Sequence, residues 1–79
     1  MTNYDMEIRD KVMHVLIECR EEKEITQKDL ADALGTKPTT VASWEQGKSL
    51  PSIAMLLRLS RYYNKSIGYM YGEGSADEG

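Results

Sequence analysis

The sequence contains few of the residues that stabilise small folds through disulfide bonds or a bound metal ion. Its 79 residues include one cysteine, one histidine, two prolines and no phenylalanine. A single cysteine excludes an internal disulfide, and no Cys/His spacing resembles a metal site. No apolar run approaches the roughly 18 residues of a membrane span, and the N-terminus lacks the order of a signal peptide. We therefore expect a cytoplasmic protein without a metal, cofactor or small-molecule substrate.

The chain also lacks the positive charge of a general polyanion binder, because its formal net charge is −3. Acidic residues concentrate in the first third and at the C-terminus, whereas segment 26–51 is nearly neutral. Local field matters more than total charge for phosphate contacts, so the count weakens a nucleic-acid interpretation without excluding it. A chain this short leaves little room for a substrate cleft, and no nucleophile, base and orienting residue converge. We expect no enzymatic activity.

Helical periodicity is what the sequence does contain. Segment 3–23 carries apolar residues at spacings of three and four, which predicts an amphipathic helix with a buried stripe of Ile8, Val12, Val15, Leu16 and Cys19. Thr26 followed by Asp29 is close to a capping box and opens a second helix. Its buried stripe comprises Leu30, Ala31 and Leu34, and Gly35 ends it.

Three further helices are predicted along the rest of the chain. Pro38 suits the first turn of a helix 38–46, which Gly47 ends. Ser52 can cap a fourth helix, whose expected apolar stripe is Ile53, Leu56, Leu57, Leu59 and Tyr63, before Asn64 as a left-handed terminator. A short turn from Ser66 through Met70 closes at Gly72. We predict an all-α domain of five helices over 1–72 and a disordered polar tail over 73–79.

The link between the second and third predicted helices is short, and this restricts how the two helices can pack. It forces the two helices to pack at a steep angle, which is the helix-turn-helix arrangement. At 100° per residue, Val41, Trp44 and Glu45 share one face of helix 38–46 with Pro38, and the opposite face carries Thr39, Ala42, Ser43 and Gln46. With the first face packed inward, the second is free to enter the major groove of DNA, whose width suits a helix.

Several motifs of this sequence resemble those of a known family. Segment 16–71, and above all TQKDLADALG (26–35), VASWEQGK (41–48) and LPSI (50–53), looks like the phage repressor and Cro family, also called the XRE family. The resemblance implies a compact lambda-repressor-like domain that binds double-stranded DNA as a transcriptional repressor. In combination and at these intervals the motifs are highly specific, although each alone would be weak.

The resemblance also implies roles for individual residues. By it, Gln27 binds a backbone phosphate, and Thr39 and Ser43 read base edges. The residues near the sugar-phosphate backbone are Lys37, Thr40 and Lys48, and Gln46 is the one amide on the exposed face of helix 38–46. By the same resemblance, Arg20 and Glu45 form an internal ion pair between the first and third helices.

Elementary physical arguments support these residue roles. Gln27 lies at a helix N-terminus, where free N–H groups favour a phosphate. Thr39 and Ser43 are four positions apart and hence neighbours on one face. A charge at Glu45, on the inward face, needs a partner.

The sequence departs from the family pattern at two turns and on the exposed face. Lys37 stands where a small hydroxyl residue usually caps the third helix, and Glu24 replaces a glycine that commonly ends the first, which predicts a strained or displaced turn. The exposed face has few groups for bidentate base contacts, so specificity would come from hydroxyls, methyls, waters and DNA shape.

Several alternatives stay open. Tyrosine and methionine residues crowd the C-terminus, and we expect a homodimer through Ile67, Tyr69 and Met70, with two recognition helices about 34 Å apart on a pseudo-palindromic operator. An antitoxin or a restriction-modification controller would have the same fold. A protein-interaction module that has lost DNA binding would fit the acidic charge.

Overall fold

Helices account for all regular structure in the part of the chain that the computed structural model describes, residues 3–73. They are α1 (Asn3–Glu22), α2 (Gln27–Leu34), α3 (Pro38–Glu45), α4 (Ile53–Tyr63) and α5 (Ile67–Met70). The predicted all-α fold is confirmed, with helix ends within one residue of those expected for the first and third helices. The Glu73 N–H still donates to the Gly68 carbonyl at 3.1 Å. The rest of the predicted tail, 74–79, lies outside the described residues.

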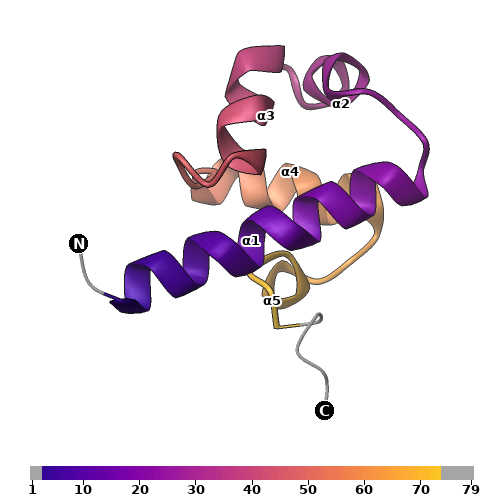
Figure 1. Cartoon of the computed structure of the whole chain (residues 1–79). Coiled ribbons are helices and arrows are strands. Elements are labelled where there is room, and N and C mark those ends of the chain that lie inside the picture. The colour runs from indigo at the N-terminus through magenta and orange to yellow at the C-terminus, as the bar shows by residue number, and fades with distance from the viewer. Residues whose placement is uncertain (1–2, 74–79) are drawn as a thin grey trace.

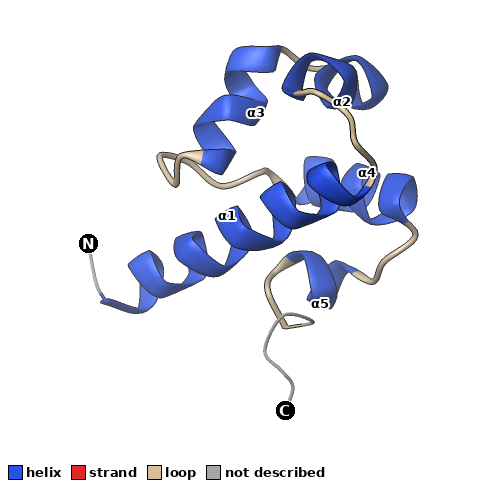
Figure 2. Cartoon of the chain, turned by 45° about the vertical axis from the view of Figure 1, so that its right-hand side comes forward, coloured by secondary structure: helices blue, strands red, loops and turns tan. Residues whose placement is uncertain are grey.

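The long helix α1 forms the middle of the domain (Figure 1). Helices α2 and α3 lie on one side of it and α5 on the other, and Figure 2 shows the same arrangement after rotation. The core between them is formed by Val12, Val15, Leu16, Cys19, Leu30, Ala31, Leu34, Val41, Trp44, Leu56, Leu59, Tyr63 and Met70, all of them buried. The predicted stripes of α1 and α2 are therefore the ones that pack, with Ile8 only partly buried.

Short-range capping fixes where the later helices begin. The Thr26 Oγ1 accepts a hydrogen bond from the Asp29 N–H at 3.0 Å, and the Asp29 carboxylate accepts one from the Thr26 N–H at 3.1 Å. The second of these bonds holds the pKa of Asp29 below its usual value. Ser52 and Ser66 cap α4 and α5 in the same way, by accepting from the N–H three residues on. The predicted capping box and the predicted N-caps are confirmed.

The turn after α1 is strained, as expected from the missing glycine. Glu24 adopts φ +57°, a left-handed conformation that Asn64 shares at the end of α4. For a residue with a Cβ this conformation costs about 1–2 kcal/mol, and for asparagine less.

Glu24→Gly should therefore raise the free energy of unfolding by about 0.5–1 kcal/mol, because glycine relieves the strain but gains entropy in the unfolded chain. Thermal unfolding followed by circular dichroism measures the change. Glu22→Gly is the matched control, since Glu22 lies in the last turn of α1 and glycine there should destabilise. If both variants melt below the wild type, the turn at Glu24 is not strained.

The structure corrects three predictions about apolar residues. Ile53 and Leu57, expected in the core, are 76% and 38% exposed, because α4 packs along a narrower stripe of Leu56, Leu59 and Tyr63. Met70, expected at a dimer interface, is wholly buried, since the short helix α5 inserts this side chain into the core. Met70 is thus not available to a partner.

Two other residues lie where the sequence predicts. Trp44 and Cys19 are buried, and burial is the main cause that raises the pKa of the Cys19 thiol. His14 is exposed on α1, where its Nδ1 lies 2.8 Å from the Asp10 carbonyl oxygen. Among residues 3–73 no cluster of potential ligands suits a metal ion, and none of the helices is long and apolar enough to cross a membrane.

Candidate nucleic-acid interface

Helices α2 and α3 form a tight angular unit. Only Gly35–Lys37 join them, and Gly35 adopts φ +74° while its N–H donates to carbonyls of the last turn of α2. The next N–H, of Thr36, donates to the Ala31 carbonyl at 2.9 Å. A side chain with a Cβ would be strained at Gly35, so this residue permits the sharp reversal. In Figure 1 the two helices accordingly cross steeply instead of lying antiparallel.

One side of α3 is fixed to the domain and the other is open. Val41, Trp44 and Glu45 are 0%, 3% and 8% exposed. On the opposite side Thr39 and Gln46 are exposed, and Ala42 and Ser43 are half-buried. The split predicted from the helical period holds for Val41, Trp44 and Glu45 but is wrong for Pro38, which is exposed because the first turn of α3 lies beyond the packed surface. From Val41 to Glu45 the helix is therefore packed against the domain, while Thr39 and Gln46 are exposed at its two ends.

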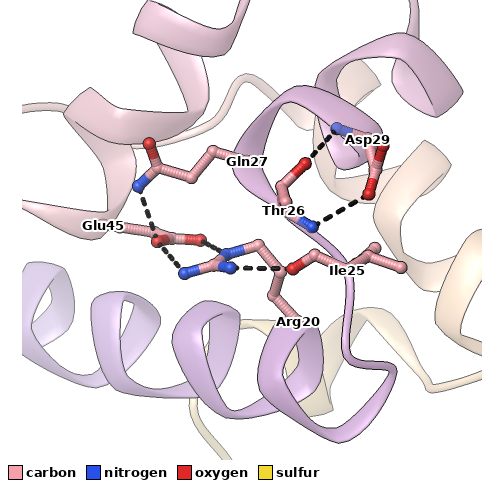
Figure 3. A network of polar contacts seen from close by, with 6 residues as sticks. All are labelled: Arg20, Ile25, Thr26, Gln27, Asp29 and Glu45. Carbon is pink, nitrogen blue, oxygen red and sulfur yellow. Dashed lines mark hydrogen bonds and ion pairs between the residues drawn. The ribbon is translucent and has the colours of Figure 1, made fainter.

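A partly buried polar network ties α3 to α1 and α2 (Figure 3). The Arg20 guanidinium donates to both carboxylate oxygens of Glu45, from Nε at 2.7 Å and from Nη2 at 3.0 Å. Arg20 also donates from Nη1 to the Ile25 carbonyl at 2.8 Å. The bond to Glu45 is the main cause that raises the pKa of Arg20. The Arg20–Glu45 pair is thus bidentate, the geometry in which arginine binds carboxylates most strongly.

Gln27 takes part in this network, which the sequence alone did not indicate. Its Nε2 donates to Glu45 Oε1 at 3.0 Å. An amide nitrogen carries two N–H groups, so one remains for a further acceptor outside the network. A phosphate contact by Gln27 stays a prediction, now with a side chain held in place by Glu45.

Ser43 has a partner that sequence reasoning missed. Its Oγ lies 2.7 Å from the Ser49 Oγ, in the turn that follows α3. A hydroxyl has one donor and two acceptor sites, so this bond leaves capacity for a base edge. No helical spacing links these two positions, and no local pattern could have revealed the contact.

The comparison with known proteins agrees with this geometry. A helix-turn-helix family model matches residues 16–70, which include α2, α3, α4 and α5. The chain belongs to the XRE family of helix-turn-helix proteins. The family comprises DNA-binding regulators and not enzymes.

Individual relatives in this family are longer than the chain. It is 30% identical over 63 residues to the HTH-type transcriptional regulator YqaE of Bacillus subtilis, a match that covers 80% of this chain and 53% of the relative. It is 39% identical over 44 residues to multiprotein-bridging factor 1 of Debaryomyces hansenii, covering 56% and 29%. Human endothelial differentiation-related factor 1 is 35% identical over 51 residues, covering 65% and 34%.

Unpaired lysines stand at both ends of α3 in this family member. Lys37 is the N-cap residue, but its side chain makes no capping bond, as the sequence predicts. Lys48 follows α3, and neither lysine forms an ion pair with any residue that the structure describes, whereas Lys28 pairs with Asp32 at 3.1 Å. Between them, Thr40 is half-buried in the first turn of α3. The exposed face of α3 is therefore flanked by two cations that no described carboxylate neutralises.

Proposed function

We propose that this chain is a sequence-specific DNA-binding transcription regulator that inserts α3 into the major groove. The observation that supports the proposal is the packed inner side of α3, which leaves Thr39 and Gln46 exposed and Ser43 half-buried on the opposite side. A helix with its side chains is about 10–12 Å in diameter, close to the width of the major groove. This helix is already anchored by an ion pair, so its entry into the groove should cost little further conformational entropy.

Phosphate contacts would set the register of the helix on DNA. Lys37, Lys48 and Thr40 lie at the ends and first turn of α3, and the remaining N–H of Gln27 extends the set to α2. Such contacts provide affinity without sequence information. Base contacts would then come from the hydroxyls of Thr39 and Ser43 and the amide of Gln46, so we expect modest specificity for each half-site.

The regulatory sense that we propose is repression, by occupation of an operator. YqaE carries the name of a transcriptional regulator, and the multiprotein-bridging factors carry a name for joining proteins. An antitoxin or a restriction-modification controller would use the same interface, and the neighbouring gene would distinguish them.

We also propose a homodimer through the outer side of α5. Ile67 is 38% exposed and Tyr71, just after the helix, is 39% exposed, with the half-buried Tyr69 between them. Exposed tyrosine and aliphatic side chains are enriched at protein interfaces. The buried Met70 has no part in this contact. A two-fold dimer would place its recognition helices about one DNA turn, roughly 34 Å, apart.

Selection of bound sequences from a random DNA pool tests both proposals. We expect a pseudo-palindrome with half-site centres about 10 base pairs apart, bound with an affinity that falls steeply as salt rises. A single unrepeated half-site would contradict the dimer. No binding to any duplex at low salt would contradict the DNA-binding function.

The second candidate is a protein-interaction module of the same fold. Its supporting observations are the net charge of −3 and the exposed apolar residues Ile53 and Leu50, at 76% and 40%. Contiguous patches of exposed apolar residues often mark sites of protein interaction. Absence of DNA binding in the selection would favour this candidate.

A further inference from the structure

Helix α1 extends well beyond the segment that the family model matches. It begins at Asn3, whereas the match begins at residue 16. In Figures 1 and 2 the N-terminal half of α1 runs out beneath the turn that follows α3. A shallow cleft of about 360 Å³ lies between them, lined by Met6, Arg9, Asp10, Met13, Gln46 and Gly47. The extension of α1 therefore borders the end of the proposed recognition helix.

Arg9 is the residue that connects the two elements. Its Nη1 donates to the Lys48 carbonyl at 2.9 Å, and the side chain is half-buried. Within residues 6–73 no carboxylate lies within ion-pair distance of this guanidinium. Asp10 lines the same cleft, but its carboxylate faces His14 Nδ1 at 3.7 Å. Arg9 is thus held in place through a neutral carbonyl oxygen, and no carboxylate of residues 6–73 neutralises its charge.

The position of this charge suits an anion outside the domain. Arg9 donates to the backbone of Lys48, so these two basic residues meet at the turn that follows the C-terminal end of α3. A guanidinium has five N–H donors, of which the Lys48 carbonyl takes one at Nη1, and the Nε–H of Arg9 is buried without a partner. The second N–H of Nη1 and the two of Nη2 remain for phosphate oxygens.

We propose that Arg9 binds a phosphate of the DNA backbone beside the one bound by Lys48. This inference rests on the proposed function, because it extends the contact of α3 with DNA to α1, outside the family-matched segment. Arg9 adds affinity on any duplex and contributes nothing to sequence preference, as expected for a backbone contact. The bond to the Lys48 carbonyl positions the guanidinium before DNA arrives.

Salt titrations of DNA binding test the proposal. Each phosphate contact contributes about 0.9 to the slope of log K against log salt on duplex DNA. Arg9→Gln removes the charge and keeps an N–H donor for the Lys48 carbonyl. We expect it to reduce the slope by about 0.9, so that its affinity loss between about 50 and 200 mM salt is roughly threefold smaller than that of the wild type. The change should be equal on the selected operator and on a random duplex, and Arg9→Lys should restore the slope.

Matched variants separate the possible outcomes. Arg61→Gln removes the same charge from the exposed last turn of α4 and should leave the slope unchanged. If Lys48→Gln lowers the slope but Arg9→Gln does not, the inference on Arg9 is wrong while the proposed function stands. A lower melting temperature of Arg9→Gln with an unchanged slope would assign Arg9 a structural role only. A wild-type protein that shows no salt-dependent binding would remove the proposed function itself.

Discussion

Arg20→Ala should lower the free energy of unfolding by about 3–5 kcal/mol, because it leaves the Glu45 carboxylate buried without its cation. The Glu45 side chain is only 5% exposed, and Arg20 donates to both of its oxygens. Gln27 would remain as a single neutral donor. One amide hydrogen bond does not compensate for the desolvation of a carboxylate.

The expected loss is large for a domain of this size. A chain of this length is stable by about 4–12 kcal/mol, and in a small domain each 1 kcal/mol shifts the melting temperature by about 4–8 °C. Arg20→Ala should therefore melt at least about 12 °C below the wild type, in thermal unfolding followed by circular dichroism. Arg61→Ala, which removes an exposed arginine with no ion pair to a described residue, is the control and should change the melting temperature little.

A double-mutant cycle shows whether the loss belongs to the pair. If an unpaired Glu45 is the cause, Arg20→Ala combined with Glu45→Ala should be less destabilised than the sum of the single variants. Additive losses, or an Arg20→Ala variant as stable as the wild type, would show that the pair does not hold α3 in place.

Ser43→Glu should weaken DNA binding at least about a hundredfold, because it places a carboxylate on the face of α3 that we propose enters the groove. The negative charge would meet phosphates and the acceptor-rich edges of the bases. Since Ser43 is half-buried and makes one hydroxyl bond, to Ser49, the loss of stability should be about 1 kcal/mol. Electrophoretic mobility shift on the selected operator measures binding, and thermal unfolding measures stability.

Two controls isolate the effect of the charge. Ala33→Glu adds the same charge to an exposed position of α2 and should reduce affinity far less. Ser49→Ala removes the hydroxyl bond of Ser43 without adding charge, so it reports what the bond alone contributes. If Ser43→Glu binds the operator as well as Ala33→Glu does, α3 does not face DNA.

The local rules predicted the helices because their causes are local. The capping bonds of Thr26 and Ser52 span three residues, and the left-handed conformations of Asn64 and Glu24 arise within single turns. The inward side of α3 followed from its period, since only one arrangement buries Trp44 and Val41 together.

Contacts between residues far apart in the sequence determined the features that local sequence patterns could not predict. Ile53 and Leu57 have the same apolar character as Leu56, yet only Leu56 is buried. The sequence pattern predicted Met70 at an interface, but the packing of α5 buries its side chain in the core. The contacts of Arg9 with Lys48 and of Ser43 with Ser49 join separate elements, and no spacing rule relates them.

The sequence by itself thus determined the helix-turn-helix unit, its family and the residues on the outer side of α3, because each is written in short-range pattern and motif. Only the tertiary structure decided which apolar residues of α4 and α5 are covered, how Gln27 joins the Arg20–Glu45 pair, and where the long α1 meets the turn after α3. Those outcomes depend on which helix surfaces meet in space, and a helix of given sequence can present more than one apolar stripe to its neighbours.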